Sequence, residues 1–151
     1  FQRKKNAIQI ITKAAPDVFN HNLETVPRIY KEVRKGANFK NSLSLLKQVK
    51  NNNKKIWTKS GIMLGLGETT EEILEVMMQM RKVNVDFITI GQYLQPTKKH
   101  HKLIKYYDLE EFKYLEKKAW EMDFKMVSSS PLTRSSYHAD NHFQKLRANI
   151  G

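Results

Sequence analysis

The sequence contains no cysteine, so the chain can form no disulfide bond. Long apolar runs are also missing, and no segment approaches the roughly 20 apolar residues that a membrane-spanning helix needs. No internal repeat, low-complexity tract or glycine- and proline-rich linker divides the chain. These absences leave residues 1–151 as a single segment, which is long enough to form one domain with a buried core.

Negative charge is scarce: 15 acidic residues stand against 27 lysines and arginines, for a net charge of +12. Such a balance favours acidic partners, which include nucleic acids and acidic proteins. Aromatic residues are not interleaved with the lysine clusters, as a base-stacking platform would require. We therefore interpret the lysines as a solvated basic surface, with steering of acidic proteins as one alternative and a basic nucleic-acid-binding module as another.

Hydrophobic periodicity alternates between short strands and amphipathic helices. It predicts strands over residues 17–21, 56–64, 85–90 and 124–128, and helices over residues 2–14, 27–33, 41–52, 70–82 and 108–122. Thr69 and Asp108 each fit as a helix N-cap, because a glutamate follows three residues later. The tail over residues 129–151 is irregular, with a helix expected over 140–148. Strand–helix alternation with short connections predicts an α/β fold with parallel strands, equivalent to half of a barrel.

Polar and glycine-rich motifs follow three of these strands: Asn20-His21-Asn22, Gly65-Leu66-Gly67-Glu68 and Gly91-Gln92-Tyr93. Ligands bind at the carboxyl ends of parallel strands, so we expect the three motifs to converge. Asn22 and Glu24 are the strongest candidates, because an amide and a carboxylate two residues apart can grip a vicinal diol. The alternative is that the asparagines satisfy backbone groups in a turn.

The glycine motif is moderately specific. It matches neither the dinucleotide fingerprint nor a P-loop, and a tight turn without a ligand remains the alternative. Gly65 and Gly67 lack side chains that would block the approach of a ligand to the backbone. Lys59 and Ser60 precede this turn, and we expect Glu68 to bond with free amides at the following helix N-terminus. Gln92, Gln95 and Pro96 are expected to line the mouth of the site.

Four segments closely resemble motifs of lipoyl synthase, a family of the radical S-adenosylmethionine (SAM) superfamily, in the same order along the chain. They are Asp17-Val-Phe-Asn-His-Asn-Leu-Glu-Thr25, residues 58–68, Gly91-Gln-Tyr-Leu-Gln-Pro96 and Pro131-Leu-Thr-Arg-Ser-Ser-Tyr-His-Ala-Asp140. Biotin synthase is similar only through the Asn-His-Asn-Leu-acid segment and lacks the Arg-Ser-Ser-Tyr motif. The resemblance implies the C-terminal half of a partial (β/α) TIM barrel of radical SAM type.

The resemblance also implies an activity, namely insertion of two sulfur atoms at carbons 6 and 8 of a protein-bound octanoyl chain. The cofactors would be SAM and two [4Fe–4S] clusters. By resemblance, the residues near SAM are Asn20, Asn22, Glu24, Lys59, Ser60, Gly65 and Gly67. Ser136, with Ser135 as the alternative, would be a ligand of the auxiliary cluster that donates sulfur. Arg134 would add positive charge beside that cluster or the substrate.

Lipoyl synthases hold their clusters with two cysteine triplets, and this chain has none. We therefore expect a C-terminal portion of the enzyme that binds no cluster alone, and the alternative is a divergent homologue that has lost this chemistry. The five histidines are not accompanied by the ligands of a mononuclear metal site. The implied partners are octanoylated lipoyl-carrier domains or the glycine-cleavage H protein, with ferredoxin or flavodoxin as electron donor. Neither nucleic acid nor membrane is expected, and the implied compartment is the cytoplasm, or the mitochondrion in a eukaryote.

Overall fold

The computed structural model describes residues 8–10, 13–14, 16–34 and 36–133 of the chain. Within these ranges one sheet of four parallel strands has the order β1-β2-β3-β4. The strands are β1 (Val18–Asn20), β2 (Trp57–Leu64), β3 (Phe87–Gln92) and β4 (Met126–Ser129). The helices are η1 (Pro27–Ile29), α2 (Tyr30–Val33), α3 (Phe39–Asn52), α4 (Thr70–Lys82) and α5 (Leu109–Glu121). The α/β fold with parallel strands is confirmed, and it is consistent with a fragment of a radical SAM barrel.

The two predicted helix starts are confirmed by complete capping boxes. The Thr69 side chain accepts a hydrogen bond from the Glu72 amide, and the Glu72 carboxylate accepts one from the Thr69 amide. Asp108 and Glu111 make the same reciprocal pair at α5. Each box satisfies backbone donors that the first helical turn leaves free.

Several element boundaries differ from the prediction by one or two residues, and those of α3 and β3 have a clear physical reason or consequence. Helix α3 begins at Phe39 rather than residue 41, because the Asn38 side chain accepts from the amides of Lys40 and Asn41 and so caps the helix earlier. Strand β3 continues to Gln92 rather than ending at residue 90. Gly91 pairs with Met63 of β2, so the glycine lies inside the ladder rather than after it.

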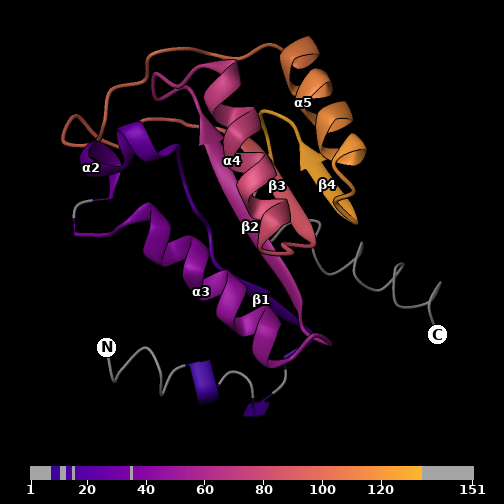
Figure 1. The fold of residues 1–151 in the computed structure, drawn as a ribbon. Helices are drawn as coiled ribbons and strands as arrows, with labels where there is room; N and C mark the ends of the chain where they lie inside the picture. The colour runs from indigo at the N-terminus through magenta and orange to yellow at the C-terminus, as the bar shows by residue number, and fades with distance from the viewer. Residues whose placement is uncertain (1–7, 11–12, 15, 35, 134–151) are drawn as a thin grey trace.

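The two faces of the sheet have different environments, because successive side chains of a strand point to opposite faces. Ile62, Leu64, Ile88 and Ile90 pack in the main core with apolar residues of α3, α4 and α5. Figure 1 shows α4 lying along β2 and β3, between α3 and α5. The opposite face carries Gly61, Met63, Thr89 and Gly91 instead. Helices therefore cover one face, and small or polar residues mark the other near the carboxyl ends.

The remaining expectations on the fold concern the two ends of the chain. Residues 8–10 and 13–14 are helical, as predicted for that segment. The expected helix over 140–148 lies outside the described residues, as does the tail from residue 134 onward. In the part of the chain that the structure describes, no helix has the length and apolar character needed to cross a bilayer.

Candidate functional site

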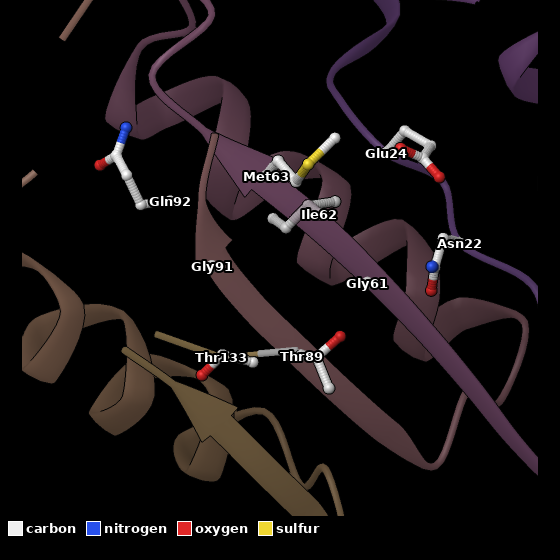
Figure 2. A pocket seen from close by; sticks show the side chains of 9 residues that line it. All are labelled: Asn22, Glu24, Gly61, Ile62, Met63, Thr89, Gly91, Gln92 and Thr133. Carbon is white, nitrogen blue, oxygen red and sulfur yellow. The ribbon is translucent and has the colours of Figure 1, made fainter. Parts of the chain in front are cut away.

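A cavity of about 240 Å³ opens on the face of the sheet opposite the core. Figure 2 shows its lining side chains around the carboxyl halves of β2 and β3. They are Asn22, Glu24, Gly61, Ile62, Met63, Thr89, Gly91, Gln92 and Thr133. The segments after β1 and after β4 thus meet the two central strands at one place. Two of the three strand-end motifs, those of Asn22 and Gln92, contribute to the cavity as expected.

Gly61 forms the floor of this cavity. A Cβ atom at Gly61 would collide with Thr89 Oγ1 and lie 3.0 Å from Asn22 Oδ1. Two oxygen atoms, one from β3 and one from the segment after β1, therefore converge above a position where any side chain would displace them. A glycine within a strand commonly marks such a close approach.

Gly91 marks a similar close approach on the neighbouring strand, β3. A Cβ atom there would lie 2.8 Å from the carbonyl oxygen of Thr133. The segment after β4 reaches this point through a turn, in which the Thr133 amide donates to Ser130 O and the Ser130 amide donates to Ile90 O. The Thr133 hydroxyl also contacts those of Ser128 and Ser130, at 3.1 and 2.9 Å. The chain is thereby held against β3 at the edge of the cavity.

Asn22 and Glu24 lie on the cavity side of the segment that follows β1. This segment runs beside β2: the Glu24 amide donates to Gly61 O, and the Met63 amide donates to Glu24 O. Leu23, between the two polar residues, is completely buried in the core. The predicted juxtaposition of the amide and the carboxylate is therefore present in the structure.

The backbone at this pair is not simply extended. Glu24 has a φ of 78°, in the left-handed region that non-glycine residues rarely adopt. Conformations of this kind cost of order 1–3 kcal/mol and cluster at functional sites. Asn22 Oδ1 is buried and has no hydrogen-bond partner within the described part of the chain, and the same holds for the Thr25 hydroxyl oxygen. A buried acceptor without a partner, next to a glutamate with a strained backbone, is an arrangement that a bound polar ligand would explain.

Four of the other predicted residues lie near the cavity without lining it. Asn20 is exposed at the end of β1. Lys59 is a buried residue of β2, on the same face as Gly61. The Ser60 hydroxyl accepts from the Leu23 amide at 3.1 Å, so it holds the Asn22–Glu24 segment from the core side. The ring of His21 stacks on that of Phe19, with centroids 6.5 Å apart.

The space beside the glycine turn after β2 is filled by other residues of the chain. A Cβ atom at Gly65 would collide with Gln92 Nε2 and lie 2.5 Å from Lys105 O. Gly65 and Gly67 have φ values of 110° and 109°, so both also satisfy a backbone requirement. At Gly67 only ordinary contacts surround the Cβ position. The structure thus accounts for both glycines by local packing and conformation, and neither lines the cavity.

The expectation for Glu68 is corrected by the structure. Its carboxylate does not bond to amides of α4, but accepts from the Gly65 and Leu66 amides at 3.1–3.2 Å. The Tyr107 hydroxyl donates to the same carboxylate at 2.9 Å. Burial, reinforced by the negative charge of Glu68, raises the pKa of Tyr107 well above its ordinary value. Helix α4 already has the capping box of Thr69 and Glu72, which leaves Glu68 available to the turn.

Gln92 connects the cavity wall to the following loop. Its Nε2 lies 3.0 Å from the carbonyl oxygens of Leu64, Tyr93 and Lys105, and its Oε1 accepts from the Tyr107 amide at 2.9 Å. Burial alone raises the pKa of Tyr93, whose hydroxyl donates to His101 O. Gln95 and Pro96, which were expected at the mouth with Gln92, are exposed and lie outside the lining.

Sequence reasoning missed Gly61, Met63, Thr89 and Thr133 as lining residues. A signal existed for Gly61, since an isolated glycine in an apolar strand indicates close approach. Thr133 had no such signal, because it approaches the site only through the turn after β4. Arg134, Ser135 and Ser136 lie outside the described residues. Among the residues that are described, no group of three or more histidines and carboxylates is placed to hold a metal ion.

Comparison with known protein families gives an independent result. The family model described as Radical SAM superfamily matches residues 3–80. This range comprises 78 of the 151 residues and includes the Asn22–Glu24 segment, β2 and the glycine turn. The chain therefore belongs to the Radical SAM superfamily, whose chemistry uses S-adenosylmethionine and an iron–sulfur cluster.

Proposed function

We propose that the chain is part of a lipoyl synthase, in which its cavity binds part of SAM. The observation that carries this proposal is the cluster of Asn22, Glu24 and Gly61. Asn22 Oδ1, which has no hydrogen-bond partner among the described residues, and Glu24 line the cavity, and Gly61 allows Asn22 and Thr89 to approach β2 closely. These groups fit the vicinal diol of a ribose, because each hydroxyl can donate to one of the two oxygen acceptors.

The size of the cavity also suits this role. At about 240 Å³ it is smaller than the roughly 300–1,000 Å³ of a complete small-molecule site. It can take one portion of an adenosine ligand, with Met63 as an apolar contact and Asn22 and Glu24 as the polar anchors. When bound, SAM and a reduced cluster would supply a carbon radical that can abstract hydrogen from an unactivated C–H bond. The residues of this chain bind and orient the nucleoside.

The chain does not fit a cluster by itself. It has no cysteine, and thiolates are the usual ligands of iron–sulfur clusters. The cysteine ligands that the resemblance to lipoyl synthase implies are therefore not supplied by this sequence. We assign no step of the chemistry to a cluster held by the described residues.

The resemblance of the tail motif supports a further assignment. Ser136, with Ser135 as the alternative, is proposed to bind the auxiliary cluster, and Arg134 to neutralise nearby negative charge. A serine oxygen matches iron–sulfur chemistry less well than a thiolate, which suits a cluster that must give up sulfur. In the holoenzyme, Ser136→Ala should abolish sulfur insertion while SAM cleavage continues. Normal lipoyl formation by that variant would refute the assignment.

The proposed substrate is an octanoyl chain on a lipoyl-carrier domain or on the glycine-cleavage H protein, with ferredoxin or flavodoxin as reductant. The proposed compartment is the cytoplasm, or the mitochondrion in a eukaryote. A biotin-synthase-like sulfur transfer is the alternative within the superfamily. It is disfavoured because biotin synthase lacks the Arg134–Tyr137 motif.

Mass spectrometry of the product tests the proposal. The holoenzyme, supplied with SAM and a reductant, should add two sulfur atoms to an octanoylated carrier domain. Conversion of dethiobiotin instead of the carrier would establish the alternative. Salt-dependent titration with DNA provides the test against a nucleic-acid-binding module, since tight binding with a steep salt slope is expected only of that class.

A further inference from the structure

The loop between β3 and α5, residues 93–108, is the longest irregular segment among the described residues. Loops above about 12–15 residues are uncommon in compact domains and are usually functional. Figure 1 shows the loop crossing from the tip of β3 past α2 before it returns to α5. Its base is joined to the cavity through Gln92, whose side chain contacts both the Lys105 carbonyl and the Tyr107 amide.

Hydrogen bonds within the loop and to neighbouring elements hold the loop in place. The Ile104 amide donates to Gly65 O at 2.7 Å, and the imidazole of His101 lies 2.8 Å from the Glu32 carboxylate on α2. A turn at Thr97–His100 is closed by the His100 amide, which donates to Thr97 O, and by the contact of their side chains at 2.8 Å. A preorganised surface loses little conformational entropy when a partner binds, so a loop of this kind is suited to docking.

Charge on the loop is of one sign. Between Asp86 and Asp108 the chain has four lysines and no acidic residue. Lys105 pairs with Glu111 at 2.6 Å. Lys98, Lys99 and Lys102 are exposed, and none of them has a carboxylate partner among the described residues. Three uncompensated cations therefore project from a rigid loop beside the cavity.

Apolar side chains are exposed among these lysines. Leu94, Ile104 and Tyr106 have exposed fractions of 49%, 58% and 69%. Apolar residues bordered by charge indicate a protein–protein contact. A nucleic-acid surface would instead need several aromatic rings aligned with the cations, and Tyr106 is the one strongly exposed tyrosine among the three of the loop.

We propose that residues 94–106 form the docking surface for an acidic protein domain that carries its substrate on a flexible arm. This inference rests on the proposed function, since it supposes a protein-bound substrate. Lysines at the rim steer the acidic domain and raise the association rate. The exposed apolar residues supply the salt-independent part of the contact. Docking here places the arm beside the Gln92 side of the cavity.

Binding of an acidic, octanoylated lipoyl-carrier domain, measured by biolayer interferometry over a range of salt concentrations, tests the inference. Lys98→Glu, Lys99→Glu and Lys102→Glu are combined in one loop variant. The control combines Lys47→Glu, Lys54→Glu and Lys55→Glu, three exposed lysines on α3 and just before β2. Both variants change the net charge equally. The loop variant should lose at least tenfold in affinity with a flatter salt slope, and the control should stay within about twofold of wild type.

The apolar part has its own test: Tyr106→Ala should weaken binding several-fold at high salt and leave the salt slope unchanged.

Equal losses in the loop and control variants, or none in either, would overturn the docking surface. Displacement of the carrier domain by a short DNA duplex at equivalent concentration would also overturn the docking surface. If wild type forms lipoyl product but both variants bind normally, the docking surface fails and the proposed function stands. If the loop variant alone loses binding but octanoyl is never converted, the docking surface stands and the proposed function fails.

Discussion

The amino and carboxyl ends of the β-sheet differ in whether their buried polar atoms have hydrogen-bond partners. At the amino end, the Asp86 carboxylate accepts from Lys50 Nζ at 2.7 Å and from the Thr58 amide at 2.9 Å. At the carboxyl end, Asn22 Oδ1 is buried without a partner among the residues that the structure describes, and Glu24 has a left-handed backbone. A satisfied network stabilises the fold, whereas unsatisfied and strained groups lower stability unless a ligand engages them. The difference is consistent with the proposal that this domain is stabilised at one end of the sheet and binds SAM at the other.

Aromatic packing strengthens the contrast. At the amino end, Trp57 and Phe87 stack with centroids 5.4 Å apart, and the ammonium groups of Lys50 and Lys125 lie 5.5 and 4.9 Å from the Trp57 ring. Cations over aromatic faces add to the stability of such a cluster. At the carboxyl end of the same face, Gly61 and Gly91 instead allow Thr89, Asn22 and Thr133 to approach the strands closely.

The largest effect on stability is expected at the amino end. Asp86→Ala removes the partner of Lys50, whose side chain is 14% exposed, and leaves the Thr58 amide unsatisfied. Breaking a buried ion pair in this way costs about 3–5 kcal/mol. Urea unfolding should show this loss, while Glu110→Ala, at an exposed pair, should cost below about 1 kcal/mol. Similar losses in the two variants would remove the contrast between the ends.

The next largest effect concerns binding. Gly61→Ala places a methyl group where Thr89 Oγ1 and Asn22 Oδ1 converge, so we expect SAM affinity to fall at least tenfold. Overpacking at this site should cost about 1–3 kcal/mol of stability. Isothermal titration calorimetry measures the affinity. The double variant Gly61→Ala, Thr89→Ala relieves the collision, so its stability should recover while its affinity stays low. Full recovery of affinity would show that the cavity is not the ligand site.

Smaller effects are expected at the polar anchors. Asn22→Ala and Glu24→Ala should each weaken SAM binding by about 1 kcal/mol or more, the cost of one hydrogen bond whose partner stays buried. Asn22→Ala should leave unfolding nearly unchanged, because its oxygen has no partner to lose. Glu24→Gly should weaken binding yet raise stability by up to about 1 kcal/mol, since glycine accepts a φ of 78°. Unchanged affinity in all three variants would contradict a ligand role.

The smallest effect is a pH dependence at the start of α4. A hydrogen bond from Arg28, supported by the Thr69 amide, lowers the pKa of Glu72 to about 2. Because the folded pKa is lower than the unfolded one, this stabilisation is fully present above the ordinary carboxyl pKa. It is lost as the pH falls from about 4.5 to about 2. Both side chains contact water, so the change should be slight. Thermal unfolding of wild type and Glu72→Gln should converge across this range, and a constant gap would exclude the ion pair as the cause.

Much of the architecture was predictable from local signals. Helix α4 has the predicted bounds, and the capping boxes at Thr69 and Asp108 are recognisable from a glutamate three residues on. Parallel pairing followed from strand–helix alternation, which then placed the motifs of Asn22 and Gln92 at one end of the sheet. These features depend on residues close together in sequence, and the sequence therefore reports them.

The features that the sequence did not predict depend on contacts between residues far apart in the chain. Thr89 and Asn22 are 67 positions apart; the register of β2 with β3 brings Thr89 over Gly61, and the pairing of the segment after β1 with β2 brings Asn22 there. Gly65 was interpreted as space for a ligand, but residues 103–105, far along the chain, fill that space. The Arg28 side chain also reaches across the turn, donating to Gly67 O and to the Glu72 carboxylate. No spacing rule anticipates such pairs, because they arise from the packing of whole elements.

The carboxylate of Glu68 has a consequence for ligand selection. Adjacent amides in a glycine turn are the groups with which many proteins bind phosphate. Here the amides of Gly65 and Leu66 are already bonded to an anion that is covalently part of the chain. A phosphate approaching this turn meets a negative charge and no vacant donor from these two amides. An adenosine ligand that carries phosphates therefore gains no anchor there, whereas one that carries a positively charged sulfonium is not repelled.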